Sequence, residues 1–338
     1  MIALQGFAAG ASDSLGNGSG RGRVDFYPLR SVNYLLPVPS TVKYDYRVYV
    51  PSRHSMSKDL PLFVMVHGCG TTADQQMHAS QINELAEAEG FLVMHPDNGG
   101  GCWRAVLSAL DSIHRGGGGE ADLLAEMTRA TMANYNVDPE RVYMIGMSSG
   151  AFQTTHTAAA YPEIYAAVGV MAGGGFGMNV GCIALPDAAA PALAPLAIAE
   201  MGTRARVIPF ISLGGTTDPL GETPTIGGCS RLAFIESMAT NMLLAGNRYA
   251  PDLSSTVKGQ VPNGYSWTKE VWRDRSGCQI SERWIIDSMG HYWSGGSSDP
   301  QWAPWTDPKG PSANRAAWEF FSRYRKSDTI NECAESRR

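Results

Sequence analysis

Hydrophobic residues along the chain form short runs separated by polar, glycine-rich segments. Six of these runs are four to seven residues long and end at turn residues: 62–66, 91–94, 142–145, 167–171, 207–213 and 283–286. Runs this short that do not alternate with polar residues are typical of strands buried on both faces, as in a parallel sheet. Residues 42–50 differ, because apolar and polar side chains alternate there with a period of two. This segment is predicted to be a half-buried strand near the edge of the sheet.

Segments with helical character lie between the apolar runs, near residues 76–88, 120–134, 149–160 and 231–245. The last of them has Ser230 as a candidate N-cap and Gly246 as a stop signal. Strand and helix therefore alternate along the chain. This order predicts an α/β fold with a mostly parallel central sheet and helices on both faces.

The ends of the chain and two internal stretches depart from this alternation. Residues 1–24, rich in Gly, Ser and Ala, are predicted to be a flexible tail, and residues 327–338 a second tail. One catalytic domain is predicted between them, over residues 25–326. Residues 184–206 and 249–277 are predicted to be surface insertions of that domain rather than a second domain.

Composition and charge narrow the functional classes. The 338 residues are 43% hydrophobic, carry a net charge of −5 and contain no run of lysine or arginine. A basic groove for nucleic acid or anionic lipid is therefore not expected, and no apolar stretch is long enough for a transmembrane helix. The first residues, MIALQGFAAGASDS, lack a basic segment and a full apolar segment, so they are not an intact signal peptide.

Six cysteines are spread along the chain without a C-x-x-C pair that could hold a metal or form a redox dithiol: Cys69, Cys102, Cys182, Cys229, Cys278 and Cys333. Their even number favours disulfides in a secreted or periplasmic protein whose signal peptide is absent from this sequence. Buried free thiols in a cytoplasmic enzyme remain the alternative.

The stretch Gly146-Met147-Ser148-Ser149-Gly150 fits the pattern G-x-S-x-G. The pattern alone is weak in a chain with 38 glycines. Its position is more specific, because it directly follows the strand predicted at 142–145 and precedes the helix predicted at 149–160. A strand, a sharp turn and a helix form the nucleophile elbow of α/β-hydrolases. Ser148 is therefore the candidate nucleophile.

A serine nucleophile needs a histidine base and an acid, which follow in the order Ser, acid, His in this fold. Only His156 and His291 come after Ser148. His156 lies on the same predicted helix, which would carry it away from the elbow, so His291 is the candidate base. Asp218, after the strand predicted at 207–213, is the favoured acid. The other aspartates that remain open are Asp287, Asp274 and Asp252.

Two backbone N–H groups are needed for the oxyanion of acyl transfer. Those of Ser149 and Cys69 are the candidates, because one follows the nucleophile and the other lies after an earlier strand. His67 is expected to brace this loop. Trp103, Tyr292 and Trp293 are candidates for substrate contact, with packing as their alternative role. Neither a metal nor an organic cofactor is implied.

Several motifs of the chain, in this order, resemble those of one family. They are HGCG at 67–70, CWR at 102–104, RGGGGE at 115–120, NVDPERVYMIGMSSGA at 136–151, YPEIYAAVGVMAGG at 161–174, GHYWSGG at 290–296 and TDPKGP at 306–311. Together they resemble the poly(3-hydroxybutyrate) depolymerase-like esterases, α/β-hydrolases related to feruloyl and acetylxylan esterases. The resemblance extends from about residue 40 to residue 325. The chain departs from the family at Gly214-Gly215, where the family often has His-Gly.

The resemblance implies the same triad of Ser148, Asp218 and His291, and a disulfide between Cys69 and Cys102 beside the site. Cys182–Cys229 and Cys278–Cys333 are the pairings expected for the other cysteines, among several possible ones. The predicted activity is that of a secreted serine carboxylic-ester hydrolase. It would act through an acyl-enzyme on short-chain or aromatic esters, of a polyester or of feruloyl or acetyl groups in plant cell walls. An acyltransferase with the same triad and a non-catalytic binding protein are the alternatives.

Overall fold

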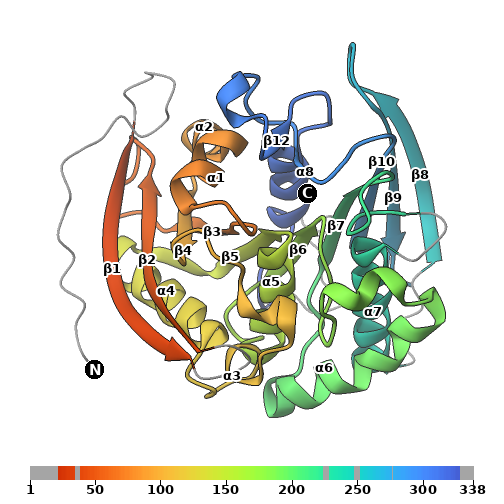
Figure 1. Ribbon diagram of the computed structural model, residues 1–338, viewed down its shortest axis with the longest axis horizontal. Helices are drawn as coiled ribbons and strands as arrows, with labels where there is room; N and C mark the ends of the chain where they lie inside the picture. Colours follow the sequence, from red (N-terminus) through yellow and green to blue (C-terminus); the bar gives the residue numbers. More distant parts are fainter. Residues whose placement is uncertain (1–21, 35–38, 224–227, 247–251, 276, 328–338) are drawn as a thin grey trace.

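The computed structural model describes residues 22–34, 39–223, 228–246, 252–275 and 277–327. Ten strands form a single sheet with the order β1-β2-β4-β3-β5-β6-β7-β10-β9-β8 (Figure 1). Their bounds are β1 Arg23–Tyr34, β2 Ser40–Val50, β3 Leu60–Val66, β4 Leu92–Asp97, β5 Val137–Met147, β6 Ala167–Met171, β7 Phe210–Gly215, β8 Asp252–Gln260, β9 Ser266–Arg273 and β10 Gln279–Ile286.

The six strands from β4 to β10 in this order are parallel to one another. Two antiparallel strands extend the sheet at each edge, β2 and β1 on one side and β9 and β8 on the other. The mostly parallel sheet expected from the apolar runs is confirmed. All six runs lie in or overlap strands of the parallel block, whose side chains are buried on both faces.

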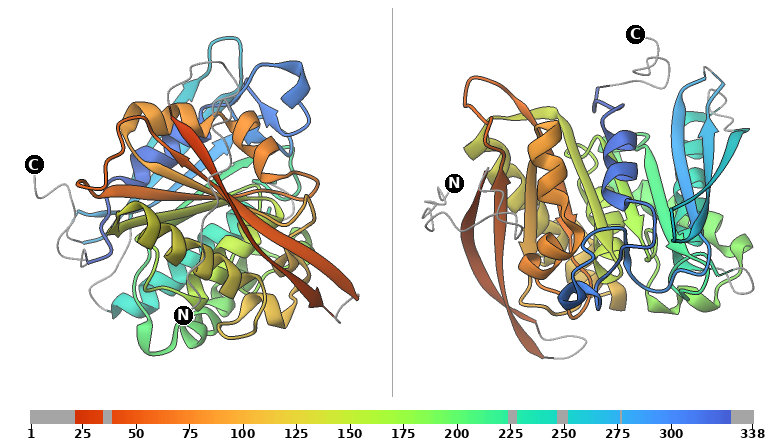
Figure 2. Two further views of the ribbon diagram at one scale, coloured as in Figure 1. Left: turned by 90° about the vertical axis from the view of Figure 1, so that its left-hand side faces the viewer. Right: turned by 90° about the horizontal axis from the view of Figure 1, so that it is seen from above.

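Helices cover both faces of the sheet, as the two views of Figure 2 show. One layer contains α1 Ala73–Ser80, α2 Ile82–Glu89 and α8 Ala313–Phe321; the other contains α4 Glu120–Tyr135, α5 Ser149–Ala160 and α7 Cys229–Ala245. The shorter elements are η1 Arg104–Leu107, α3 Leu110–Ile113, η2 Val180–Ala184, η3 Asp187–Leu193, α6 Ala194–Met201, η4 Gly202–Arg204 and η6 Pro300–Trp302, with a small sheet of β11 Trp293–Ser294 and β12 Thr306–Asp307. None of the helices described here is long and apolar enough to cross a membrane.

The predicted helices at 120–134 and 149–160 are confirmed, whereas two details of the others are wrong. The segment 76–88 is not one helix, because Gln81 has φ 59° and separates α1 from α2. Ser230 is not the N-cap of α7, since Gly228 occupies that position. The Ser230 hydroxyl instead accepts a hydrogen bond from Gly173 N at 3.1 Å.

The stretch 249–277 is not a surface excursion, because it contributes β8 and β9 to the central sheet. Many of the β8 and β9 side chains that the structure describes are exposed or half-buried. A strand of this kind has no apolar run, so the sequence did not reveal it. The first strand was also not predicted, and β1 begins at Arg23, inside the segment expected to be a tail.

The Ala/Pro-rich stretch 184–206 forms η3, α6 and η4, which pack on the α5 and α7 layer. After α6 and η4, the Arg206 guanidinium donates to the Tyr165 carbonyl at 2.8 Å, just beyond the end of α5. The chain near α6 is therefore fixed at the end of α5 that is remote from Ser148.

Candidate active site

Ser148 occupies a sharp turn between β5 and α5. Its backbone has φ 54° and ψ −122°, a conformation that L residues rarely adopt and that a close-packed environment must hold in place. Ser148 N donates to the Met171 carbonyl at the end of β6, at 3.0 Å. A Cβ atom at Gly146 would lie 2.1 Å from the Gly150 carbonyl oxygen, so the turn requires glycine there. This is the geometry expected of a nucleophile elbow.

His291 and Asp218 form a hydrogen-bonded pair at the ends of two neighbouring strands. The His291 Nδ1 and Asp218 Oδ2 atoms are 2.9 Å apart. The Asp218 carboxylate is fully buried, whereas the His291 side chain is 39% exposed. Asp218 Oδ1 accepts a further hydrogen bond from Leu220 N at 2.8 Å. A buried carboxylate held at both oxygens can fix the tautomer and the orientation of an imidazole.

The rival aspartates have other partners. Asp287 is exposed and accepts a hydrogen bond from the Ser266 hydroxyl. Asp274 accepts one from Cys278 N. The side chain of Asp252 lies outside the described part of the chain. Among the candidates whose side chains are described, only Asp218 is paired with His291.

The topology brings Ser148, Asp218 and His291 to the same edge of the sheet. They follow β5, β7 and β10, whose carboxyl ends lie side by side with that of β6. Hydrogen bonds link these ends, including Ala172 N to the Leu213 carbonyl and Thr216 N to the Ile286 carbonyl, each at 3.0 Å. The described side chains include no direct hydrogen bond between Ser148 and His291. Such bonds are often long in the free state of a hydrolase and shorten when substrate binds.

A buried ion pair fixes the segment that carries Asp218. Arg283 on β10 donates from Nε to the Glu222 carboxylate at 3.0 Å, and Glu222 is fully buried. Glu222 N donates to the Gly215 carbonyl at the end of β7. Burial raises the pKa of Glu222, and the Arg283 charge opposes this shift. The ion pair ties the acid loop to the strand that leads to His291.

The loop after β3 lies against Ser148, the candidate nucleophile. A Cβ atom at Gly68 would be 3.2 Å from the Ser148 Cβ. Cys69 follows, bridged to Cys102 as the resemblance implies, and Gly70 N donates to the Gly100 carbonyl at 3.0 Å. Within the described residues, neither Cys69 N nor Ser149 N donates to a protein acceptor. Both N–H groups therefore remain candidates for the oxyanion hole.

His67 and Trp103 support this loop from beneath. His67 is fully buried, its Nδ1 lies 2.8 Å from the Gly68 carbonyl, and burial lowers its pKa. The Trp103 indole N–H donates to the His67 carbonyl at 2.9 Å, and its ring is also fully buried. The structure thus gives His67 the bracing position expected for it. It corrects the expectation for Trp103, whose ring packs inside the molecule and offers no surface to a substrate.

The two aromatic residues after His291 differ from each other in burial. Trp293 is fully buried and its indole N–H donates to Asn314 Oδ1, so its role is packing, which corrects the expected substrate contact. Tyr292 is half-buried. Trp305, which the sequence did not single out, contacts the candidate oxyanion loop: its indole N–H donates to the Gly70 carbonyl at 3.3 Å. Nothing in the sequence pattern linked Trp305 to this loop, 235 residues away.

Two of the three expected disulfides are present, Cys69–Cys102 and Cys182–Cys229. The second bridge joins η2 to the first residue of α7. The remaining predicted pairing, Cys278–Cys333, involves Cys333, which lies outside the described residues.

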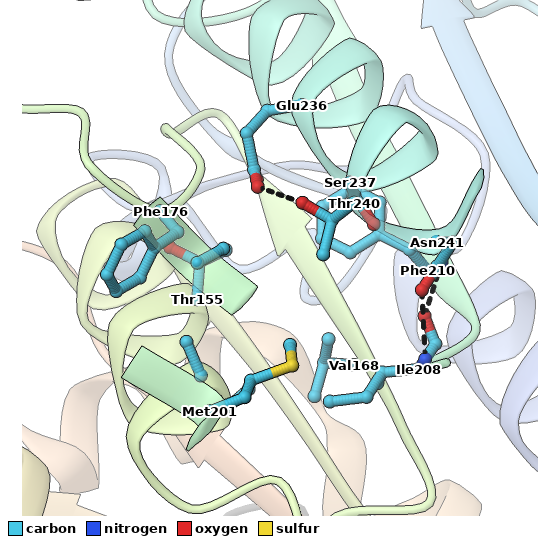
Figure 3. A pocket seen from close by; sticks show the side chains of 13 residues that line it. Thr155, Val168, Phe176, Met201, Ile208, Phe210, Glu236, Ser237, Thr240 and Asn241 are labelled. Atoms are coloured by element: carbon cyan, nitrogen blue, oxygen red, sulfur yellow. Dashed lines mark hydrogen bonds between the residues drawn. The ribbon is translucent and has the colours of Figure 1, made fainter. Parts of the chain in front are cut away.

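An apolar cavity of about 40 Å³ lies beneath the α5, α6 and α7 layer, and Ser148, Asp218 and His291 are not among the residues that line it (Figure 3). Its wall contains one acidic side chain, Glu236, whose Oε1 accepts a hydrogen bond from the Thr240 hydroxyl at 2.7 Å. Burial raises the pKa of Glu236 to about 7. Among the described residues, no group of three or more His, Cys, Asp or Glu side chains is placed to hold a metal.

Comparison with known proteins agrees, over the first half of the chain, with the family resemblance found in the sequence motifs. Residues 44–208, which include the oxyanion loop and the elbow, match the family described as esterase PHB depolymerase. Over this segment, which is just under half of the chain, the sequence is similar to the PHB depolymerase-like esterases. The rest of the sheet, with Asp218 and His291, lies outside the matched segment.

Several proteins similar to this segment carry a more specific name. The probable acetylxylan esterase A of Aspergillus fumigatus is 34% identical over 176 residues, which cover 51% of this chain and 45% of that protein. Acetylxylan esterase A of Talaromyces purpureogenus is 35% identical over 132 residues, or 38% of this chain and 34% of that protein. The chain thus spans less than half the length of these relatives.

The whole fold is that of an α/β-hydrolase. A solved acetyl xylan esterase from Aspergillus awamori superimposes with a TM-score of 0.61 at 21% identity, over 88% of this chain and 98% of that one. Because it covers 88% of this chain, the superposition must extend beyond residue 208, where the family match ends. The fold class predicted from the apolar runs is confirmed.

Proposed function

We propose that this PHB depolymerase-like esterase hydrolyses carboxylic esters through an acyl-enzyme on Ser148. The observation that carries the proposal is the juxtaposition of a strained serine elbow with a buried-aspartate–histidine pair at adjacent strand ends. The acetylxylan esterases similar to its first half have names that agree with this activity.

In the proposed reaction, His291 Nε2 accepts the Ser148 proton as Oγ attacks the ester carbonyl. The N–H groups of Cys69 and Ser149 stabilise the oxyanion, and His291 protonates the departing alcohol. Water then attacks the acyl-enzyme with His291 again acting as the base, which releases the carboxylic acid and restores Ser148. Asp218 holds the Nδ1–H of His291 and stabilises its charged form throughout.

The substrate class we favour is an ester with a short or aromatic acyl group attached to a bulky carrier. Acetylated xylan is one candidate, suggested by the names of the relatives, and feruloyl esters and a polyester are others. Two disulfides support a location in an oxidising compartment, outside the cell or in a periplasm.

Active-site labelling tests the proposal. A fluorophosphonate should form one stoichiometric adduct on the peptide that contains Ser148, and native enzyme should release acetate from p-nitrophenyl acetate with the same sensitivity to inhibition. Heat-denatured protein is the control and should not be labelled. An adduct on another serine, or unimpaired hydrolysis after complete labelling of Ser148, would overturn the assignment.

A further inference from the structure

Trp302 and Trp305 present a partly exposed aromatic surface beside the candidate oxyanion loop. Both side chains are half-buried, and their ring centroids are 6.1 Å apart. Trp293 N donates to the Trp305 carbonyl at 3.0 Å, and the Trp305 indole N–H reaches Gly70. Trp305 thus connects the segment that follows His291 with the loop that follows β3. It lies at the rim of the site and not in a remote part of the surface.

The surface continues outward along α1. Trp302 stacks on His78, with ring centroids 5.5 Å apart and an angle of 18° between the planes. The helix begins at Ala73, just after the oxyanion loop, so His78 lies roughly 8 Å further along its axis. Figure 1 shows β12 and its neighbouring loop beside α1 and α2. Within the described part of the chain, the Trp302 indole N–H has no acceptor, so it is available to a ligand.

The neighbourhood of these rings is polar. Asp299 and Gln301 beside Trp302 are exposed and hydrogen-bonded to each other. The exposed large aliphatic side chains of the described chain lie on other segments: Met56, Leu107, Leu110, Val180, Ile183, Leu196, Met242, Leu243 and Val257. Aromatic faces surrounded by hydrogen-bonding groups suit a sugar ring, whose C–H face packs on the π-system while its hydroxyls meet polar groups. A polyester chain would favour a surface with more aliphatic area.

We propose that Trp302, Trp305 and His78 form a subsite for a pyranose ring of a polysaccharide whose ester group reaches Ser148. The proposal rests on the proposed ester hydrolysis and identifies the carrier of the ester. Trp302 supplies the stacking face and a free donor, whereas Trp305 also positions the Gly70 loop. A substitution at Trp302 therefore separates binding of the carrier from the chemistry at Ser148.

Binding is measured first in protein that cannot turn over, so that the outcome does not depend on the proposed activity. The probe is a linear, unacetylated β-1,4-xylo-oligosaccharide, titrated by calorimetry into Ser148→Ala and into Ser148→Ala with Trp302→Ala. We expect Trp302→Ala to weaken binding roughly 3- to 10-fold, as for loss of one aromatic contact. Trp302→Phe should retain part of the affinity. Leu196→Ala, an exposed apolar residue on α6, is the matched control and should leave it unchanged.

Turnover provides the second measurement. Trp302→Ala should raise KM for acetylated xylan by a similar factor and leave kcat/KM for p-nitrophenyl acetate unchanged. Equal affinity of both variants for the oligosaccharide would overturn the subsite. So would Trp302-dependent adsorption to poly(3-hydroxybutyrate) film without binding of the oligosaccharide. Failure of the wild-type enzyme to cleave any ester would instead refute the proposed function. The calorimetric measurement would still test the sugar site, because it does not depend on turnover.

Discussion

At the scale of single residues, the backbone of Ser148 is the most informative feature of this chain. A non-glycine residue at φ 54° costs free energy, and it persists because glycines at 146 and 150 allow the neighbouring backbone to approach. This conformation places Ser148 at the turn between β5 and α5. Packing alone does not require these backbone angles, because a residue with ordinary angles could fill the same volume. We therefore attribute the conformation of Ser148 to the function of the site.

Replacing Ser148 by alanine should lower kcat for p-nitrophenyl acetate by roughly 10⁴ or more without loss of the fold. The remaining activity would come from the oxyanion hole and from binding. Circular dichroism and the melting temperature serve as controls for the fold. Retention of more than about a tenth of wild-type turnover in a contaminant-free preparation would be inconsistent with a serine nucleophile here.

The buried carboxyl of Glu236 should make stability depend on pH. Burial raises its pKa to about 7, so the folded state binds this proton more tightly than the unfolded state. Stability contributed by the protonated form is therefore present at acidic pH and is lost as the pH rises through 7. Glu236→Gln cannot ionise and keeps an acceptor for Thr240.

The measurable consequence is a change in the pH profile of unfolding. Relative to wild type, the free energy of unfolding of Glu236→Gln should increase by about 2 kcal/mol between pH 5 and pH 8. Urea titrations at both pH values measure it. Ser237→Ala, a neighbouring residue in the cavity wall, is the control and should shift both values equally. Parallel profiles for wild type and Glu236→Gln would mean that Glu236 is not protonated in the folded state.

At the scale of elements, the two disulfides formed between described residues have different neighbours. Cys69–Cys102 joins the candidate oxyanion loop to the segment before η1, whereas Cys182–Cys229 joins η2 to α7. Their sequence separations, 33 and 47 residues, are similar. Loop-closure entropy therefore assigns both bridges a similar stabilisation, at most about 4 kcal/mol.

The functional effects of removing them should differ. Cys69→Ser with Cys102→Ser should lower kcat, because Cys69 N is one of the two proposed oxyanion donors and its loop loses a covalent anchor. Cys182→Ser with Cys229→Ser should lower the melting temperature by a comparable amount but leave kcat nearly unchanged. Kinetics on p-nitrophenyl acetate and calorimetric melting distinguish them. Equal kcat values in the two double variants would show that the Cys69–Cys102 bridge does not contribute to catalysis.

At the scale of the whole molecule, the site lies at the carboxyl edge of the parallel block, at the middle of a sheet lengthened at both ends. The Ala/Pro-rich stretch 184–206, predicted to be a surface insertion, ends near the far end of α5. Gly68 lies against Ser148, and we expect an acyl group to be held beside this loop rather than in a long apolar tunnel.

This arrangement leads us to expect kcat/KM to fall steeply from C4 to C12 p-nitrophenyl esters. A long acyl chain would remain exposed to water and gain little from binding, whereas a short one fits beside the oxyanion loop. Initial rates across the series, below the critical micelle concentration, measure the trend. Preference for C12 with activation at an oil–water interface would instead indicate a lipase.

The amino-acid sequence by itself determined the parallel block of the sheet, the elbow at Ser148 and the order of the catalytic candidates. Strands buried on both faces need uninterrupted apolar runs, and a tight strand–helix turn needs small residues beside the serine. These requirements are local, so they can be recognised in the order of residues along the chain. Strands β8 and β9 were not predicted, because strands with many exposed side chains do not need an uninterrupted apolar run.

Tertiary structure alone decided between residues that look equivalent in the sequence. Asp218 and Asp287 both precede His291, but only the first is buried and bonded to it. Trp103 and Trp305 are both aromatic residues near site motifs, yet the first lies beneath the oxyanion loop and the second at its rim. The reason is physical: burial, pairing and a pKa near 7 for Glu236 depend on neighbours brought from distant parts of the chain.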